Sequence, residues 1–261
     1  MSILWLEEVD STNTYAKEHF DELADGTLVS ARHQTAGRGR LNRVWFSESG
    51  TAITATLVMK RLESGFAAGC VGGLAALQLV RECCPSAVSL LKWPNDVYIE
   101  NAKVAGVLCE GLLRGGKLAG VVCGIGINVN NGPDGLRRVG QPAISLKTAS
   151  GRMTDFSIDL LTERLEKLLA ECYIKANLDF AFLRRRHRKE NRLIGRKIQV
   201  ISPTGEVIDG VFSDLGIDGE MQLETASGLR VFNCGDVKVD LSGTDWAGLR
   251  REMIFAGAIE S

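Results

Sequence analysis

Residues 104–129 read VAGVLCEGLLRGGKLAGVVCGIGINV, and this stretch decides the fold class. Val104 to Cys109 and Lys117 to Val129 are rich in apolar and β-branched residues, and Arg114-Gly115-Gly116 lies between them. A glycine pair between two such runs is typical of a hairpin turn, because glycine tolerates the positive φ that the turn requires. The stretch therefore predicts two strands joined by a tight turn.

Further strand-like runs precede this pair, at residues 27–31, 51–59, 88–93 and 97–99. A small-residue run over residues 67–81 predicts a tightly packed buried helix, a short helix is expected over residues 14–23, and apolar residues recur at helical spacing from about Ile158. Many strands with few helices between them predict an α+β fold, with a mixed or antiparallel sheet and helices packed on it.

The sequence pattern changes after about Arg192, where short strand-like runs begin to alternate with turn signals. Turn signals occur at Pro203-Thr204-Gly205, Asp218-Gly219 and Ser227-Gly228, at a spacing of roughly ten residues that favours a small β-barrel. We expect a large first domain over residues 1–191, the barrel over 192–241 and a tail over 242–261. Apolar residues from Trp246 to Ile254 suggest that the tail contains a docking helix.

Composition narrows the class of protein. The chain has 261 residues and a formal net charge of -1, which argues against non-specific nucleic-acid binding. No apolar run reaches the ~20 residues that span a bilayer, and the first eight residues lack the pattern of a secretory signal. The seven cysteines include no C-x-x-C pair, so we expect reduced thiols and a cytoplasmic protein. The three histidines form no cluster that predicts a transition-metal site.

Residues 34–45, QTAGRGRLNRVW, combine glycines with positive charge. Gly37 and Gly39 alternate with Arg38 and Arg40, and Arg43 follows. Glycine permits a close approach of the backbone to a ligand, and arginine offers a planar fork of donors to phosphate or carboxylate. The segment is neither a Walker loop nor a dinucleotide fingerprint. It indicates either an anion-binding loop or a basic surface hairpin.

A second polar group is Lys92-Trp93-Pro94-Asn95-Asp96, which ends one strand-like run and precedes another. Pro94 interrupts strand pairing, so these residues are expected at a strand end. Lys92 is a candidate phosphate partner. Asp96 is a candidate Mg²⁺ ligand, an acceptor for adenine or ribose, or a base for an amine. The alternative is an ordinary surface turn.

Two further positions carry candidate ligand contacts. Strand alternation places Lys103 on the same face as Ala105 and Val107, where a lysine either extends to solvent or points into a pocket. Gly124 and Gly126 leave one face of their strand as bare backbone, which suits a flat ligand or a tightly packed barrel strand.

These segments, together with Ser11-Thr12-Asn13, occur in an order that resembles the successive motifs of the biotin–protein ligases. The β-rich module after them resembles that family's C-terminal module. The resemblance implies a catalytic domain related to class II aminoacyl-tRNA synthetases, followed by a small SH3-like β-barrel. It also implies that ATP activates biotin as biotinyl-5'-AMP, which is then transferred to a lysine of a carboxylase biotin carrier domain.

The resemblance also assigns site residues. Biotin-binding positions are Ser11, Thr12, Asn13, Gln34, Gly37, Arg38, Gly39, Arg40, Trp45, Lys103, Gly106, Gly124 and Gly126. ATP-binding positions are Arg38, Arg40, Arg43, Lys92, Asn95, Asp96, Lys103 and Asn128. Catalytic positions are Arg38, Arg40, Lys92, Lys103 and Asp96, the last as the candidate base. No side-chain cluster predicts a resident metal, so Mg²⁺ is expected to arrive with ATP, with Asp96 as its candidate ligand.

Some features depart from the family or leave alternatives open. Asn42 stands where the family usually has glycine, and no helix-turn-helix precedes Asp10, so no DNA partner is expected. No membrane contact is expected, and an exposed sheet edge is free for a homodimer or the carrier. Competing interpretations are a lipoate–protein ligase, a non-catalytic biotin or nucleotide sensor, and a nucleic-acid-binding protein that uses the basic run from Arg184 to Lys189. For that run, a solvated helix end is the favoured interpretation.

Overall fold

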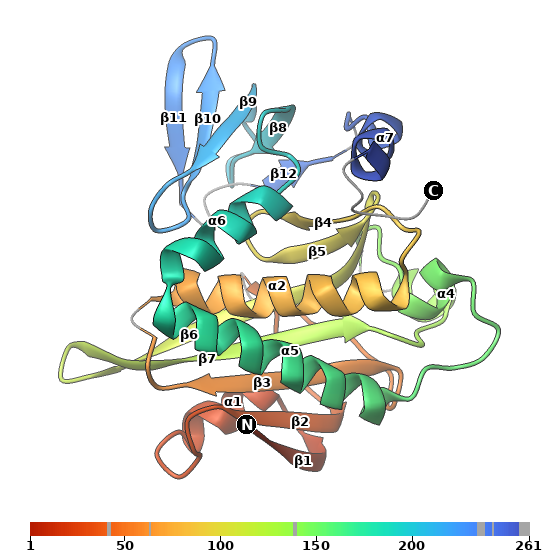
Figure 1. Ribbon diagram of the computed structural model, residues 1–261, viewed down its shortest axis with the longest axis vertical. Helices are drawn as coiled ribbons and strands as arrows, with labels where there is room; N and C mark the ends of the chain where they lie inside the picture. Colours follow the sequence, from red (N-terminus) through yellow and green to blue (C-terminus); the bar gives the residue numbers. More distant parts are fainter. Residues whose placement is uncertain (41–42, 63, 138–139, 234–237, 242, 256–261) are drawn as a thin grey trace.

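The computed structural model describes residues 1–40, 43–62, 64–137, 140–233, 238–241 and 243–255 (Figure 1). The strands are β1 Ser2–Val9, β2 Thr27–Gln34, β3 Ala52–Met59, β4 Ser89–Lys92, β5 Asp96–Ile99, β6 Ala102–Arg114, β7 Lys117–Asn128, β8 Lys197–Ile201, β9 Val207–Leu215, β10 Met221–Thr225, β11 Gly228–Phe232 and β12 Lys238–Asp240. The helices are α1 Thr12–Glu18, α2 Gly65–Cys83, α3 Pro133–Arg137, α4 Leu146–Ser150, α5 Ile158–Leu178, α6 Phe180–Glu190 and α7 Trp246–Phe255.

The larger sheet has seven strands in the order β1-β2-β3-β7-β6-β5-β4. The predicted β6–β7 hairpin is confirmed, and it pairs Cys109 with Cys123 in an antiparallel register. β1, which the sequence patterns do not predict, runs parallel to β2, whereas the other neighbouring strands of this sheet are antiparallel. The sheet is therefore mixed, and the predicted α+β class is confirmed.

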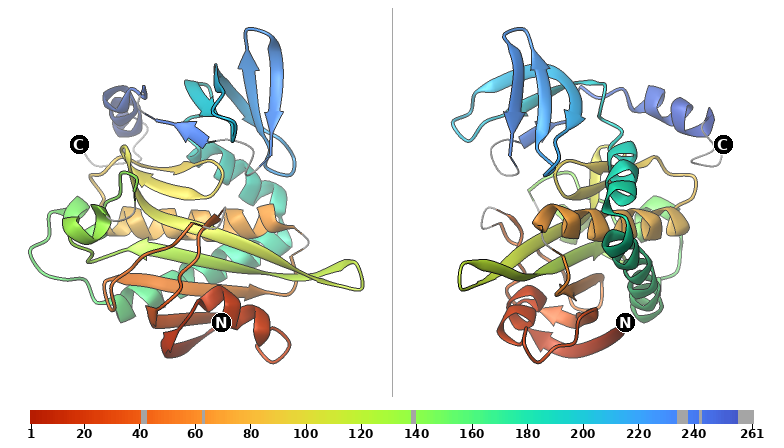
Figure 2. Two further views of the ribbon diagram at one scale, coloured as in Figure 1. Left: turned by 180° about the vertical axis from the view of Figure 1, so that it is seen from behind. Right: turned by 60° about the vertical axis from the view of Figure 1, so that its left-hand side comes forward.

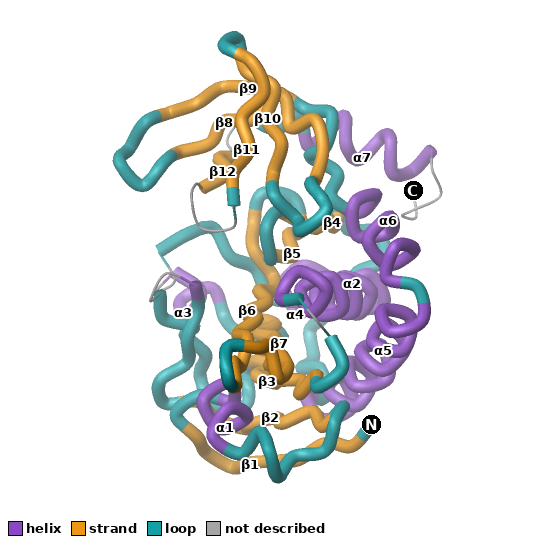
Figure 3. Tube along the Cα trace, turned by 90° about the vertical axis from the view of Figure 1, so that its left-hand side faces the viewer, coloured by secondary structure: helices purple, strands orange, loops and turns teal. Residues whose placement is uncertain are grey.

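Helices pack on both faces of this sheet. α2 and α5 lie together on one face, whereas α1 lies on the opposite face (Figures 1 and 3). α2 is long and apolar enough to cross a bilayer, but it is mostly buried and packs in the core of the protein. Gly72 allows close packing here, because a Cβ at this position would lie 2.7 Å from Cys123 Sγ. The buried helix predicted over residues 67–81 is thus confirmed.

The short helix α1 differs from its predicted range of residues 14–23. It begins at Thr12 and ends before His19, whose backbone N–H donates to the carbonyls of Tyr15 and Lys17. Phe20 is buried in a small cluster with Ala16 and Val29. The chain leaves the helix early because it turns toward β2 while Phe20 is held in this cluster.

The C-terminal module is a five-stranded antiparallel sheet in the order β11-β10-β9-β8-β12. Its core is shared with the larger sheet, because Leu90, Trp93 and Tyr98 of the β4–β5 region pack with Phe212 and other side chains of the module. Trp93 Nε1 also donates a hydrogen bond of 2.8 Å to the Gly219 carbonyl. The module therefore supports the hairpin that carries the Lys92–Asp96 segment.

The tail contains the expected helix, α7, which lies beside the C-terminal module (Figure 2). Leu249 and Met253 are buried in the core that the module shares with β4 and β5. The predicted docking helix is confirmed, and its docking surface is this shared core.

The basic run lies on α6, and one of its members is not solvated as expected. His187 is 3% exposed, and its ring lies 5.6 Å from that of Phe66 in an edge-on arrangement. Helical periodicity turns this one position inward while Arg185, Arg188 and Lys189 stay exposed. The interpretation as a solvated helix end is therefore wrong for His187.

Acid is expected to destabilise the protein through His187, because burial lowers its pKa to about 4. The unfolded chain binds a proton near pH 6.5 and the folded protein does not, so stability is full above that pH and falls between pH 6.5 and 4. Urea unfolding should show about 2–3 kcal/mol more loss between pH 7 and 4.5 in the wild type than in His187→Leu. His19→Gln is the control that keeps the wild-type profile. Parallel profiles for wild type and His187→Leu would contradict the prediction.

Candidate active site

A cleft of about 1100 Å³ lies beside the larger sheet and reaches the C-terminal module. The predicted site residues lining it are Ser11, Thr12, Asn13, Gln34, Arg38, Gly39, Arg40, Arg43, Trp45, Lys92, Asn95, Asp96, Lys103, Gly106, Gly124, Gly126 and Asn128. Gly37 lies next to the cleft, at the base of the loop, where a Cβ would approach the Trp45 carbonyl to 2.4 Å. Segments far apart in sequence are thus brought to one cavity.

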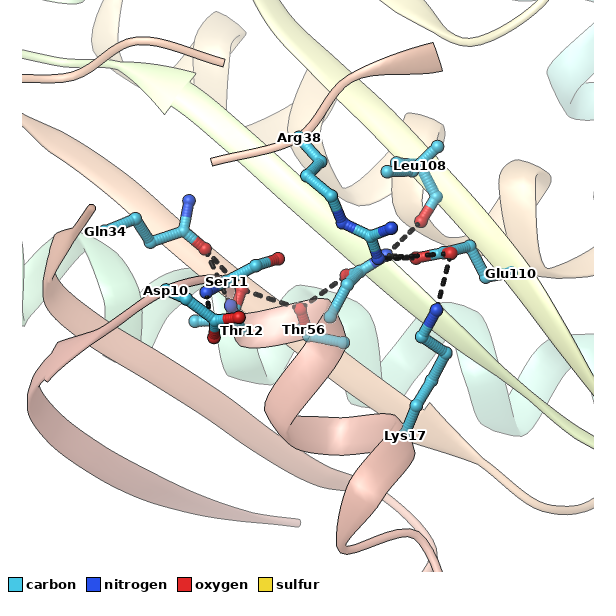
Figure 4. Close-up of polar contacts among 10 residues, drawn as sticks. Asp10, Ser11, Thr12, Lys17, Gln34, Arg38, Thr56, Leu108 and Glu110 are labelled. Atoms are coloured by element: carbon cyan, nitrogen blue, oxygen red, sulfur yellow. Dashed lines mark hydrogen bonds and ion pairs between the residues drawn. The ribbon is translucent and has the colours of Figure 1, made fainter. Parts of the chain in front are cut away.

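One end of the cleft is polar and buried. Ser11, Thr12 and Asn13, at the start of α1, are each 3% exposed. Gln34 Oε1 accepts hydrogen bonds from Thr12 N at 2.8 Å and Thr12 Oγ1 at 3.0 Å (Figure 4). Thr56 Oγ1 lies 2.8 Å from Thr12 Oγ1 and 2.7 Å from Asn13 Oδ1. Such a fixed set of donors and acceptors suits a compact polar head group.

The floor of the cleft is the glycine strand β7. A Cβ on Gly124 would lie 2.2 Å from Asn13 Oδ1, and one on Gly126 would lie 2.4 Å from the Trp45 ring. The bare strand face is therefore needed, because Asn13 and Trp45 close over it. The space between them suits an extended apolar chain lying along the strand.

The glycine–arginine segment forms a small hairpin over the cleft. Gly39 N donates to the Arg43 carbonyl at 2.7 Å, and Trp45 N donates to the Gly37 carbonyl at 2.9 Å. We call residues 37–40 and 43–45 the lid; Asn42, which stands where the family usually has glycine, lies outside the described residues. The described backbone has the hairpin pairing of that alternative, but the Arg38 and Arg40 side chains bind other parts of the protein.

The two alternating arginines attach the lid to opposite sides of the cleft. Arg38 Nη2 donates to Glu110 Oε2 at 2.9 Å, on β6. Arg40 Nη1 donates to Asn95 Oδ1 at 3.0 Å, in the turn between β4 and β5. The lid therefore spans the cleft from the polar end to the Lys92–Asp96 segment.

Lys103 lines the cleft, which agrees with the pocket alternative, but it does not share a face with Ala105 as strand alternation predicts. β5 and β6 pair Val97 with Ala105 but Tyr98 with Lys103, so Val104 is an extra residue in the ladder. Such a bulge reverses which face the next side chain occupies. Lys103 Nζ forms a 2.7 Å ion pair with Asp96 Oδ1, whereas Ala105 faces the core.

The segment after β4 supplies the other end of the cleft. Lys92 Nζ lies 4.9 Å from the centre of the Tyr98 ring. Burial lowers the pKa of Lys92, while the nearby Asp96 carboxylate opposes this shift. Asn128 Nδ2 donates to the Ile144 carbonyl at 3.3 Å, so this side chain also binds the segment that precedes α4. The cleft is lined by two carboxylates, Asp96 and Asp240, and by a larger set of cations, which leaves excess positive charge for an anionic ligand. These cations are Arg38, Arg40, Arg43, Lys92 and Lys103.

A resident metal site is absent from the part of the chain that the structure describes, where no group of three His, Cys, Asp or Glu side chains comes together. Asp96 and Asp240 are the carboxylates among the described residues that line the cleft. Mg²⁺ is commonly held by one or two carboxylates together with substrate phosphates, and the residues present fit this arrangement.

Three site residues are not predicted by the sequence patterns: Lys17, Thr56 and Glu110. Lys17 and Glu110 form a 2.7 Å ion pair at the edge of the cleft. A signal for Glu110 was present, because alternation along β6 places it on the same face as Gly106 and Leu108. No comparable signal marks Thr56, because every residue of β3 is buried.

Comparisons with known proteins agree with this site. The model of the Biotin/lipoate A/B protein ligase family matches residues 5–128. Over 243 residues the chain is 31% identical to the biotin–[acetyl-CoA-carboxylase] ligase of Paracoccus denitrificans, covering 89% of this chain and 98% of that protein. It is 28% identical to the bifunctional ligase/repressor BirA of Escherichia coli (strain K12), covering 91% of this chain and 74% of BirA.

Solved structures show the same arrangement. The biotin protein ligase of Aquifex aeolicus, in complex with biotin and ATP, has a TM-score of 0.76 and 27% identity, and the match covers 92% of this chain and 98% of that one. The fold and the cleft together define a protein ligase of the biotin/lipoate class. Within this class, the chain belongs to the biotin protein ligase family.

Proposed function

We propose that this biotin protein ligase activates biotin with ATP to form biotinyl-5'-AMP and then transfers biotin to a lysine of a carboxylase biotin carrier domain. The observation that carries the proposal is the bridging lid. Arg38 attaches the lid beside the polar pocket, and Arg40 attaches it beside Lys92–Asp96, where Lys103 pairs with Asp96. This order suits one ligand with a polar head, an apolar chain, a carboxylate and a nucleotide.

In the first step, a carboxylate oxygen of biotin attacks the α-phosphorus of ATP. The bond from that phosphorus to the bridging oxygen breaks, and pyrophosphate leaves. Two anions must approach each other, so the protein's main contribution is positive charge placed where negative charge develops. Lys103, Arg40 and Lys92 line this part of the cleft.

In the second step, the neutral ε-amine of the acceptor lysine attacks the acyl carbon of biotinyl-5'-AMP, and AMP leaves. The amine loses a proton, and Asp96 is the proposed acceptor because its carboxylate faces the cleft. The mixed anhydride is prone to hydrolysis, so a lid over the cleft protects it until the acceptor arrives.

Mg²⁺ belongs to the proposal as an ion that accompanies ATP. Asp96 and Asn95 offer oxygen atoms near the nucleotide end, which is the donor type that Mg²⁺ prefers. When bound, the ion would neutralise phosphate charge. Chelation with EDTA should therefore abolish adenylate formation, and added Mg²⁺ should restore it.

The decisive test uses the purified protein, ATP, biotin and an isolated biotin carrier domain, followed by intact-mass measurement of the carrier. We expect one biotin on the target lysine. The lipoate alternative predicts transfer of lipoate in an equimolar competition, and the sensor alternative predicts ligand binding without formation of biotinyl-5'-AMP. Either result would overturn the proposal.

The cellular setting and assembly are also proposals. Reduced cysteines support a cytoplasmic location, and six of them are free thiols in the described part of the chain. β1 is an edge strand of the larger sheet, which supports a homodimer or a carrier contact at this edge. Sedimentation with and without the carrier domain distinguishes the two.

Gly126→Ala is expected to raise the KM for biotin by about five-fold or more. The new Cβ would lie 2.4 Å from the Trp45 ring, so Trp45 must move from the floor of the cleft. The change costs about 1–3 kcal/mol of the binding free energy, as overpacking does in a core. Steady-state kinetics check this. Gly69→Ala is the control, because its Cβ would meet no atom within 4 Å. An unchanged KM in Gly126→Ala would remove Trp45 from the biotin pocket.

A further inference from the structure

Glu110 is the meeting point of three segments of the chain. Its carboxylate accepts hydrogen bonds from Asn13 Nδ2 at 2.8 Å, Lys17 Nζ at 2.7 Å and Arg38 Nη2 at 2.9 Å. Asn13 and Lys17 belong to α1, Arg38 to the lid and Glu110 to β6. Figure 4 shows the Lys17 and Arg38 side chains converging on this one carboxylate.

The charge of Glu110 is well supported. Burial acts to raise its pKa, but hydrogen bonds from Lys17 and Asn13 and the positive charges of Lys17 and Arg38 outweigh burial and lower the pKa. The carboxylate is therefore ionised at neutral pH and binds both cations. Its side chain is 24% exposed, so water screens these contacts only in part.

Asn13 connects Glu110 to the polar pocket. Its Nδ2 donates to Glu110 and to the Leu108 carbonyl at 3.1 Å, and its Oδ1 lies 2.7 Å from Thr56 Oγ1. Thr56 Oγ1 in turn lies 2.8 Å from Thr12 Oγ1, and the backbone N–H of Thr12 donates to Gln34 Oε1 at 2.8 Å. A continuous series of hydrogen bonds therefore runs from the pocket that we assign to the head group of biotin to the arginine that fastens the lid.

We propose that Glu110 is a positioning residue that keeps the lid closed through Arg38 and couples closure to the head-group pocket through Asn13. Glu110 lies outside the predicted set of ligand contacts and acts through these partners. The inference rests on the proposed function, because it assigns the lid the task of retaining biotinyl-5'-AMP. Loss of the Glu110 charge should loosen the lid while leaving the fold intact.

The first experiment compares Glu110→Gln with the wild type. Glutamine keeps the size of the side chain and an acceptor for Asn13 but loses the charge that holds Arg38. We expect biotinyl-5'-AMP, formed from α-labelled ATP, to dissociate about ten-fold faster, as the loss of one charged hydrogen bond would give. The KM for biotin should rise, whereas kcat at saturating biotin should change less.

A matched control tests whether the effect depends on the position of Glu110 at the edge of the cleft. Glu82 is also a glutamate paired with an arginine, Arg164, at 2.7 Å, but it lies on α2 outside the cleft. Glu82→Gln should keep wild-type release of biotinyl-5'-AMP. Equal release rates in Glu110→Gln and the wild type would overturn the inference, as would an equal acceleration in both glutamine variants.

A double-mutant cycle tests whether Glu110 acts through Arg38. Arg38 is 43% exposed, so Arg38→Gln is not expected to unfold the protein. If the ion pair carries the effect, Arg38→Gln should speed release as Glu110→Gln does, and the double variant should be no faster than either. Multiplication of the two effects would show that the residues act independently and would overturn the coupling.

A ligand-free measurement separates this inference from the proposed function. Trypsin cleaves after arginine, and the lid contains Arg38, Arg40 and Arg43. In the absence of biotin and ATP, Glu110→Gln should be cut within the lid several-fold faster than the wild type or Glu82→Gln. A wild type that forms no biotinyl-5'-AMP would overturn the proposed function alone, whereas equal cleavage rates would overturn the role of Glu110.

Discussion

Lys103→Gln is expected to lower the rate of biotinyl-5'-AMP formation by about 10²–10³-fold, which corresponds to ~3–4 kcal/mol of lost transition-state stabilisation. Pyrophosphate release from ATP and biotin, measured before any acceptor is added, reports this step directly. Binding of ATP alone should weaken much less, because the missing charge is needed most where the carboxylate meets the phosphate.

The size of this effect follows from the position of Lys103. Its side chain is 15% exposed and is directed toward the cleft by the Val104 bulge. A charge fixed in a partly dry cavity acts more strongly on a developing anion than a charge in water. Glutamine keeps a hydrogen-bond donor for Asp96, so that carboxylate is not left without a partner and the fold should persist.

Lys147→Gln provides the matched control for this prediction. Lys147 also forms a 2.7 Å pair with an aspartate, Asp155, but its side chain and that of Asp155 are 34% and 67% exposed. Adenylate formation should stay at the wild-type rate in this variant. A wild-type rate in Lys103→Gln, in a protein with unchanged thermal stability, would show that Lys103 does not contribute to adenylate formation.

Arg40→Gln is expected to slow adenylate formation by about 10²-fold and to raise the KM for ATP. Arg40 crosses from the lid to Asn95, at the nucleotide end of the cleft, so its loss removes both a positive charge and the attachment of the lid on that side. We also expect free biotinyl-5'-AMP in solution, detected as biotin attached to bystander lysines of added albumin.

The control for Arg40 is Arg61→Gln. Arg61 is paired with Asp25 at 3.0 Å and its side chain is 76% exposed, so its loss should leave both steps unchanged. Two outcomes would contradict the role of Arg40. One is a wild-type KM for ATP in Arg40→Gln, and the other is equal labelling of albumin by the variant and the wild type.

The predictions from sequence are confirmed where a short pattern of residues is compatible with only one local structure. The Gly115-Gly116 turn, the buried helix α2 and the small β-rich module could be predicted because turn chemistry and hydrophobic periodicity act over a few residues. β1 was not predicted, because its pairing with β2 is parallel and depends on residues separated by α1. The end of α1 depends in the same way on where Phe20 packs.

The residues of the candidate site also fall into two groups: those that sequence motifs predict and those that depend on how the strands pair. The resemblance assigns Ser11 and Gln34 to biotin and Lys92 to ATP, and one cleft contains all three. Alternation misplaced Lys103, because a bulge arises from the pairing of two strands and has no mark in either strand alone. Glu110 was overlooked because an ion pair among residues 17, 38 and 110 exists only once the sheet has formed.

From the sequence alone, the resemblance of the ordered motifs indicates the family, and short-range spacing predicts most of the strands and helices and the candidate ligand contacts. Only the folded chain shows which face Lys103 occupies, that Glu110 pairs with Arg38, and that Trp93 donates a hydrogen bond to the C-terminal module. These features depend on contacts between residues distant in sequence, and their free energy comes from partners that only the folded chain brings together.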